Sequence, residues 1–156
     1  MTSFVYPVSL SLDEGGRVLV EFPDFSFGAT DGADVEDALI RASDCLEELL
    51  AYCIDDGLAI PAPSPLPDGW AATVAPGPVI AAKAALYAAV RDAGITKVAL
   101  GKRLGMNEKD VRRMLNPRFA TKIPALARAL AALGKRLEVV VSAAPDPPSC
   151  DDKNAA

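Results

Sequence analysis

The segment Thr96–Asn116 constrains the fold more than any other part of the chain, because it has the pattern of two short helices joined by a tight turn. Thr96 can cap the first helix and Asn107 the second, each by accepting a backbone N–H. Gly105 stands where a helix ends in the left-handed conformation. Gly101 is small at a point where two helices must approach closely. This spacing is typical of a helix-turn-helix, whose second helix lies in the major groove of DNA.

The second predicted helix has an apolar face and a basic face. Val111, Met114 and Leu115 recur at helical spacing and are expected to point into a core. Lys109, Arg112, Arg113 and Asn116 are expected to face the groove, with Arg112 or Arg113 reading guanine. We assign Asn107 to the same DNA-binding surface, and the predicted phosphate contacts are Lys97, Lys102, Arg103, Thr121 and Lys122.

Two alternatives stay open for this segment. The basic residues are also compatible with a solvated face on a helical bundle. Glu108 lies in the first turn, where its carboxylate either stabilises the helix by interacting with the positive end of the dipole or accepts a hydrogen bond from a cytosine amino group.

The charges are sorted along the chain, although the total is only −5. Residues 1–69 contain 2 basic and 14 acidic side chains, whereas residues 70–141 contain 13 basic and 4 acidic ones. A basic segment suits phosphate, and an acidic segment is repelled by it and suits a basic partner. The two parts are therefore expected to bind different partners.

The N-terminal part has the pattern of a small sheet with one long helix. Residues 4–12 alternate between apolar and polar, a Gly-containing turn follows, and residues 17–22 form the returning strand. Pro7 places the first strand at a sheet edge, or itself at the start of that strand. Further extended pieces are expected over 25–30 and 69–75. The helix over 35–56 has an acidic outer face, explained by solvation or by a basic partner; its acids are Glu36, Asp44, Glu47, Glu48 and Asp55.

The Pro-rich stretch around residues 61–68 and the break at Ala75–Pro78 predict a domain boundary. We expect domains over 1–75 and 76–141 and a disordered tail over 142–156. In the second domain, helices are predicted over 79–93 and from Thr121, as its cap, to Leu133. Lys135–Val141 has a strand pattern and is the only such segment there, so we expect it to pair with a second copy through Leu137, Val139 and Val141. The sequence thus predicts an α+β protein that forms a homodimer or a higher even oligomer.

The sequence offers little chemistry of the enzymatic kind. It contains no histidine, and its three cysteines have no metal-binding spacing. We predict no catalytic residue, no metal and no cofactor. No apolar run is long enough for a membrane span and the start lacks signal-peptide character, so we expect a cytoplasmic protein with no membrane partner.

Several segments together resemble the HicB antitoxin family. FPDFSFGATDGADVEDAL (22–39) resembles the strand-loop-helix signature of that family, and GLAIPAPS (57–64) resembles the segment closing its N-terminal domain. Residues 84–140 resemble its helix-turn-helix and terminal strand. The match covers about residues 4–141. Two positions differ from the usual pattern: Phe25–Gly28 replaces Leu-Pro-Gly-Cys, and Phe119 stands where many relatives have histidine.

The resemblance implies an N-terminal partial ribonuclease-H-like domain that binds and inactivates the toxin HicA, a small basic ribonuclease that cleaves mRNA. It also implies a C-terminal helix-turn-helix domain that dimerises and represses the shared operon by binding operator DNA. On this basis the expected toxin-binding residues are Asp24, Phe25, Phe27, Glu36, Asp44, Glu47 and Glu48.

Two other functions compete with this one. A nuclease of the ribonuclease H type needs carboxylates converging on metal ions, with one inside the first strand, and residues 4–12 contain no acid. A repressor whose residues 1–69 sense a ligand, with no toxin partner, is not excluded by the sequence. A neighbouring gene for a small basic protein with one prominent histidine would favour the antitoxin.

Overall fold

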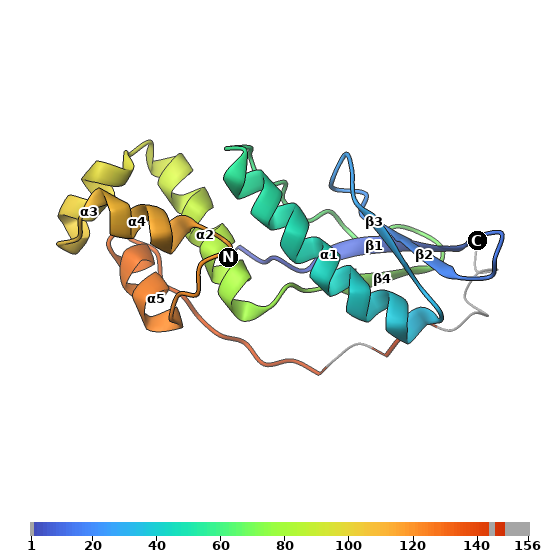
Figure 1. The fold of residues 1–156 in the computed structure, drawn as a ribbon. Helices are drawn as coiled ribbons and strands as arrows, with labels where there is room; N and C mark the ends of the chain where they lie inside the picture. The colour runs from blue at the N-terminus through green and yellow to red at the C-terminus, as the bar shows by residue number, and fades with distance from the viewer. Residues whose placement is uncertain (1, 144–145, 149–156) are drawn as a thin grey trace. The chain divides into compact units, whose positions relative to one another are not determined.

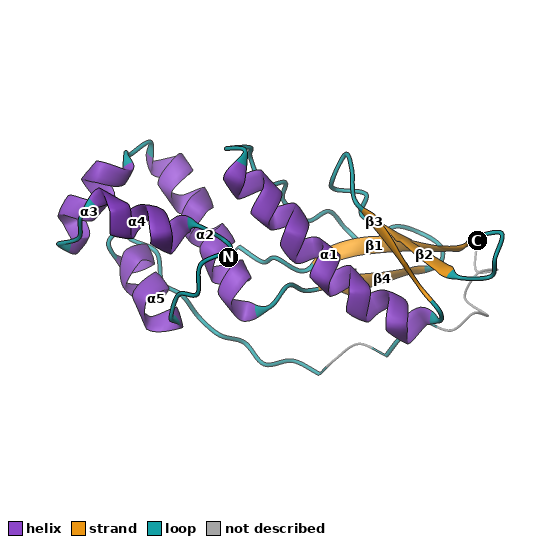
Figure 2. Cartoon of the chain, viewed as in Figure 1, coloured by secondary structure: helices purple, strands orange, loops and turns teal. Residues whose placement is uncertain are grey.

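A computed structural model describes residues 2–143 and 146–148 of the chain. It shows an α+β protein with four strands and five helices in the described part, in the order β1-β2-β3-α1-β4-α2-α3-α4-α5 (Figure 1). The chain divides into two compact units. The first contains the chain up to Leu49, Pro61–Pro76 and the described residues after Val141, and the second contains Leu50–Ile60 and Gly77–Val141. Figure 2 shows the strands in the first unit and helices α2 to α5 in the second.

The first unit is built on an antiparallel sheet of strand order β3-β2-β1-β4. The strands are β1 (Tyr6–Leu12), β2 (Val18–Glu21), β3 (Ala29–Gly32) and β4 (Ala71–Val74). β1 is a central strand, so an edge position for it is wrong. Pro7 lies at its start, because pairing with β2 begins only at Ser9. Proline is tolerated at this position, since its missing N–H is not needed for hydrogen bonding to β2, which does not extend that far.

Helix α1 (Val35–Asp55) covers one face of this sheet (Figure 1). Ala38, Ala42 and Leu46 are fully buried along it, as the spacing of its apolar residues predicts. The close approach depends on Gly32 at the end of β3. A Cβ atom there would lie 2.2 Å from the backbone nitrogen of Ala38, so only glycine fits.

The second unit packs four helices around its own core. They are α2 (Pro78–Ala93), α3 (Lys97–Leu104), α4 (Glu108–Leu115) and α5 (Ile123–Ala131). Leu86, Leu100, Val111 and Leu126, one from each helix, are fully buried. The last turn of α1 and the segment after it belong to this unit. Tyr87 of α2 donates its hydroxyl to the carbonyl of Leu58 at 2.8 Å.

Of two C-terminal predictions, the strand that pairs with a second copy is not tested by a single chain and stays a prediction, whereas the helix cap at Thr121 is wrong. Lys135–Val141 forms neither a strand nor a helix, because a strand needs a hydrogen-bonding neighbour and the strands of the described chain all belong to the first unit. Helix α5 begins at Ile123 after an N-cap at Lys122 and ends at Ala131, so Thr121 does not cap it. Residues 144–145 and 149–156 of the predicted tail lie outside the described residues.

Candidate nucleic-acid and partner interfaces

Helices α3 and α4 each begin directly after a residue whose side chain caps the helix. The hydroxyl of Thr96 accepts from the backbone N–H of Ala99 at 3.1 Å, and the amide oxygen of Asn107 accepts from Asp110 at 2.9 Å. Both caps are confirmed. The Asn107 oxygen therefore has a structural use inside the chain, besides the DNA contact predicted for this residue.

The turn between the two helices is as tight as the sequence predicts. Gly105 ends α3 with φ +65°, the left-handed conformation that glycine adopts without steric penalty. Gly101 is buried, and a Cβ atom there would lie 2.6 Å from the carbonyl oxygen of Met106. The backbone N–H of Met106 donates to the carbonyl of Gly101 at 2.9 Å. The turn therefore folds directly back onto α3.

Helix α4 buries Val111, Met114 and Leu115 and exposes its basic side chains, as expected from its periodicity. Of the predicted DNA-binding residues, those with exposed positions are Lys97, Lys102, Arg103, Asn107, Lys109, Arg112, Arg113 and Lys122. Asn116 and Thr121 are only partly exposed. The second unit thus exposes basic side chains along α4 and further cations at both ends of α3.

The two arginines proposed for base reading have different surroundings. Arg112 pairs with Glu108 one turn earlier, and its Nε donates to a Glu108 oxygen at 2.9 Å. The guanidinium carbon of Arg113 lies over the Phe119 ring, 4.6 Å from its centroid. In the isolated chain Glu108 therefore binds an arginine of its own helix, an arrangement the sequence alternatives did not include.

The loop carrying Phe119 is fixed by a lysine that the sequence analysis did not identify. Lys83 of α2 is fully buried, and its ammonium donates to the carbonyls of Asn116 at 2.5 Å and Phe119 at 2.6 Å. Burial lowers the pKa of Lys83. The Asn116 side-chain oxygen accepts from the N–H of Arg118 at 2.9 Å. Asn116 therefore closes this loop as well as ending α4. The only sequence signal was a lysine within an alanine-rich apolar helix.

Other members of the predicted phosphate set also have contacts within the second unit. Arg103 donates to the carbonyl of Ala132 at 3.4 Å, and the Thr121 hydroxyl lies 3.4 Å from the carbonyl of Phe119. Arg118, which was not predicted, lies 3.6 Å from Asp55 at the end of α1. These contacts are exposed and individually weak, so the side chains keep hydrogen-bonding capacity for a partner such as phosphate.

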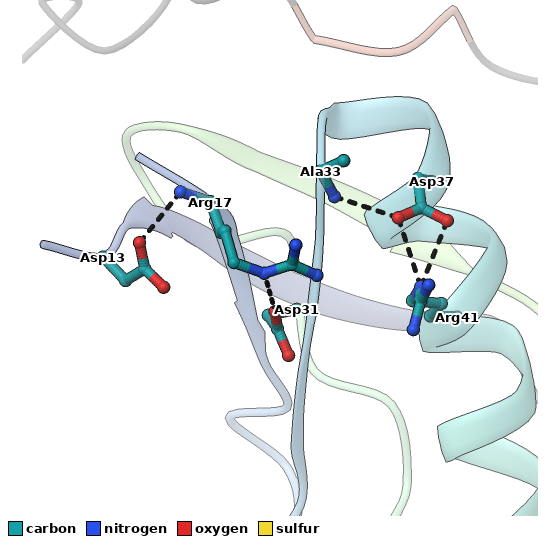
Figure 3. Close-up of polar contacts among 6 residues, drawn as sticks. All are labelled: Asp13, Arg17, Asp31, Ala33, Asp37 and Arg41. Carbon is teal, nitrogen blue, oxygen red and sulfur yellow. Dashed lines mark hydrogen bonds and ion pairs between the residues drawn. The ribbon is translucent and has the colours of Figure 1, made fainter. Parts of the chain in front are cut away.

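Residues 1–49 and 61–76 of the first unit contain two basic residues, Arg17 and Arg41, and both are paired with acids (Figure 3). Arg17 binds Asp31, and Arg41 binds Asp37, with the nearest atoms of the second pair 3.1 Å apart. Asp37 also accepts from the N–H of Ala33 at 2.9 Å, the main reason why its pKa lies below the usual value. Because both cations are neutralised locally, the remaining carboxylates dominate the potential of this unit.

The predicted partner-binding acids lie on the outer side of α1. Glu36, Asp44 and Glu48 are exposed and Glu47 is half-buried. Ile40 stands one turn from Glu36 and one from Asp44, and it is 61% exposed. The sequence analysis treated this face as purely acidic, whereas the structure shows an isoleucine within it.

Phe25 is wrong as a surface contact, because it belongs to the core of the first unit. Its ring is buried against Tyr6, with centroids 5.1 Å apart, and edge-to-face with Phe22 at 6.2 Å. Phe27 is 46% exposed, and Asp24 accepts from the N–H of Ser64 at 3.0 Å. The carboxylate of Asp24 therefore holds the loop over 61–64 in addition to the contact predicted for it.

The predicted dimerisation residues are not equivalent in the single chain. Leu137 is partly buried against the core of the second unit. Val139 and Val141 are 74% and 93% exposed, and Val140 between them is 75% exposed. Three consecutive exposed valines give this segment an uncovered apolar surface. None of the helices in the described residues is both long enough and apolar enough to cross a membrane.

Comparison with known proteins identifies the family of this chain. A family model described as the HicB-like antitoxin of bacterial toxin-antitoxin systems matches residues 5–85. Antitoxin HicB of Escherichia coli (strain K12) is 35% identical over 136 residues, which cover 87% of this chain and 98% of the relative. Antitoxin HicB 2 of Photorhabdus laumondii is 33% identical over 135 residues, covering 86% and 94%. Since the family model spans more than half of the sequence and these relatives align over nearly all of it, the chain belongs to the HicB family of antitoxins of bacterial toxin-antitoxin systems.

Proposed function

We propose that this antitoxin neutralises a HicA-type toxin that cleaves mRNA by binding it directly through the first unit. As a dimer, it represses its own operon by binding operator DNA through the second unit. The separation of charge between two compact units carries the proposal. Arg17 and Arg41, the two cations among residues 1–69, are paired with acids, and residues 77–141 contain 13 basic and 4 acidic side chains.

The DNA-binding part of the proposal treats α3 and α4 as a helix-turn-helix. The αL turn at Gly105, the close packing of Gly101 on Met106 and the cap at Asn107 support this assignment. Such a pair places α4 in the major groove, where Lys109, Arg112 and Arg113 reach base edges and the cations of α3 reach phosphates. The alternative of a solvated bundle face explains the exposure of these residues but not their concentration on one helix.

Mutants of one base-reading and one phosphate-binding residue test this part. Arg113→Ala should reduce sequence preference, with a loss of affinity for the preferred duplex of about ten-fold or more. Lys102→Ala should weaken preferred and random duplexes alike and lower the slope of log affinity against log salt by about one. The readout is titration of the DNA upstream of its own gene and of a shuffled duplex. Equal losses on both duplexes for both mutants would refute the assignment.

The dimer in this proposal forms by pairing of the Lys135–Val141 segments of two chains. The exposed valines support it, because a second copy would cover them and complete their backbone hydrogen bonds. Two-fold pairing places two recognition helices about 34 Å apart, one turn of DNA. The length and composition of the segment therefore suit a short intermolecular ribbon.

The toxin-binding part assigns the basic partner to the outer face of α1. Glu36, Asp44 and Glu48 provide the charge, and Ile40 provides an apolar contact of the kind found at the centre of protein interfaces. The β1-β2-β3 meander followed by α1 across one face is compatible with a partial ribonuclease-H-like domain, which we retain as part of the proposal.

Two triple mutants with reversed charges test the surface proposed to bind the toxin. The triple mutant Glu36→Lys, Asp44→Lys and Glu48→Lys should lose protection in a growth assay with the product of the adjacent gene, and should no longer co-elute with it. The control triple Glu14→Lys, Glu21→Lys and Asp68→Lys makes the same change of net charge at exposed acids away from α1. If both triples lose binding equally, only net charge matters and the assignment to α1 fails.

The family relationship favours the antitoxin over a ligand-sensing repressor, because the antitoxin family model matches residues 5–85 and so includes most of residues 1–69, the sensor of that alternative. It also supports a regulatory rather than a catalytic role.

A further inference from the structure

The Phe119 ring and the Arg113 guanidinium form a contact that the proposed DNA-binding function does not itself require. Arg113 lies on the outer face of α4, and Phe119 lies four residues beyond its last residue, Leu115. The guanidinium carbon stands 4.6 Å from the ring centroid, within the range of a cation–π interaction. Phe119 is 43% exposed, so the ring is not there to fill the core.

The ring is held in place by the interior of the protein. Lys83 is fully buried and donates to the carbonyls at both ends of the loop from Asn116 to Phe119. The N–H of Phe119 donates to the carbonyl of Asn116 at 3.2 Å, and the Arg118 N–H binds the Asn116 side chain. The loop therefore has anchored ends and an internal bond, and the position of the Phe119 backbone follows from them.

Arg112 provides an internal comparison. It is bound by Glu108 on the same helix, and its side chain is 65% exposed. An ion pair between two exposed, flexible side chains fixes an orientation only weakly. A guanidinium stacked on a ring keeps its N–H donors at its edge, where they can bind two acceptors of one base.

We propose that Phe119 is a positioning residue that holds the Arg113 side chain in a DNA-reading orientation before DNA binds, and that Lys83 fixes the loop on which Phe119 stands. This inference rests on the proposed DNA-binding function and assigns Arg113, rather than Arg112, to the main guanine contact. A side chain ordered in advance loses less conformational freedom on binding. The ring thus increases preference for the correct base at one position of the operator.

The test uses the full chain and two substitutions of the ring. Phe119→Leu removes the aromatic face and keeps an apolar side chain, and Phe119→Tyr keeps the face. Duplexes selected by each variant from a randomised library are sequenced, and affinities are measured for the preferred duplex and for its shuffled version. Phe119→Leu should reduce the ratio of these affinities by about two- to five-fold, the size of an exposed cation–π interaction. Phe119→Tyr should restore the ratio.

A double-mutant cycle and a matched control separate positioning from general damage. In the Arg113→Ala background, Phe119→Leu should cause no further loss of preference, because the ring has no guanidinium to hold. Tyr52→Leu removes a ring of similar exposure, 42%, from the last turns of α1 and should leave the ratio unchanged. In NMR spectra, the side-chain resonances of Arg113 should move away from their ring-shifted positions in Phe119→Leu but not in Tyr52→Leu.

The outcomes distinguish this inference from the function on which it rests. Loss of preference in Arg113→Ala with none in Phe119→Leu would overturn the positioning role and leave DNA binding intact. An increased affinity of Phe119→Leu would show that the ring withholds Arg113 from DNA, and would also overturn it. If the unmodified chain binds its upstream DNA no better than shuffled DNA, the proposed function fails and this inference fails with it.

Discussion

Lys83 shows how much one buried residue contributes to the proposed DNA-binding surface. Its ammonium binds the carbonyls of Asn116 and Phe119, so a methionine there would leave both acceptors without their donor. We expect Lys83→Met to lower the free energy of unfolding by about 1 to 3 kcal/mol, the range for losing such bonds. Denaturant unfolding measures this change. Lys102→Met, at an exposed lysine, should stay within about 0.5 kcal/mol of the unmodified chain.

The same residue predicts a pH dependence with a definite sign. Burial lowers the pKa of Lys83 below its usual value of 10.5, so between these two values the unfolded chain binds more protons than the folded chain. The stability of the unmodified chain relative to Lys83→Met should therefore rise as the pH increases through that window toward 10.5. A difference that falls with pH there would mean that folding raises the pKa of Lys83, contrary to the lowering by burial. A neutral amine retains N–H donors for both carbonyls.

Gly101 gives a prediction in which steric fit and helix propensity have opposite signs. Alanine is favoured over glycine inside a helix by about 1 kcal/mol, so propensity alone predicts that Gly101→Ala stabilises α3. The added Cβ would lie 2.6 Å from the carbonyl oxygen of Met106, a backbone atom that cannot move alone. We expect a net loss of about 1 to 3 kcal/mol in thermal or denaturant unfolding. A more stable variant would mean that the turn does not pack as described.

At the scale of elements, α3 and α4 are too short to be stable alone. Each contains eight residues, below the length at which isolated helices form in water, so caps and tertiary packing must hold them. Thr96→Ala and Asn107→Ala should each lower the unfolding free energy by about 1 kcal/mol, and Thr96→Ser and Asn107→Asp should restore it. Circular dichroism during unfolding measures both effects.

Thr121→Ala is the control for these caps. The sequence predicted that Thr121 caps the last helix, but its hydroxyl lies near the carbonyl of Phe119 and α5 has no side-chain cap. This variant should therefore change stability by less than about 0.5 kcal/mol. A loss equal to that of Asn107→Ala would indicate that Thr121 caps α5 in solution.

At the scale of the whole molecule, the C-terminal valines predict how copies associate. Val139 and Val140 are equally exposed in the single chain, at 74% and 75%, so a charge at either position has a similar effect on the isolated fold. If Leu137, Val139 and Val141 form the dimer face, Val139→Asp should weaken dimerisation by about ten-fold or more, and Val140→Asp should weaken it much less. Sedimentation equilibrium measures the dissociation constants. Equal effects would contradict strand pairing with alternating faces.

Most elements of the molecule follow from local patterns. Alternation marks β1 and β2, and helical spacing with caps and glycines marks α1, α3 and α4. Both signals depend only on neighbouring residues, so they are readable without the fold. The start of α5 was misjudged, because Thr121 has the chemistry of a cap and Lys122 does not.

What the sequence by itself determined is therefore the α+β class, the two-helix turn around Gly105, the sorting of charge and the family. These depend on spacing and composition along the chain. Only the tertiary structure decided that Phe25 belongs to the core, that β1 is a central strand and that Lys83 holds the loop of Phe119 against Arg113. The physical reason is distance along the chain: Lys83 and Phe119 are 36 residues apart, and nothing local to either shows that packing of α2 brings an ammonium to that carbonyl.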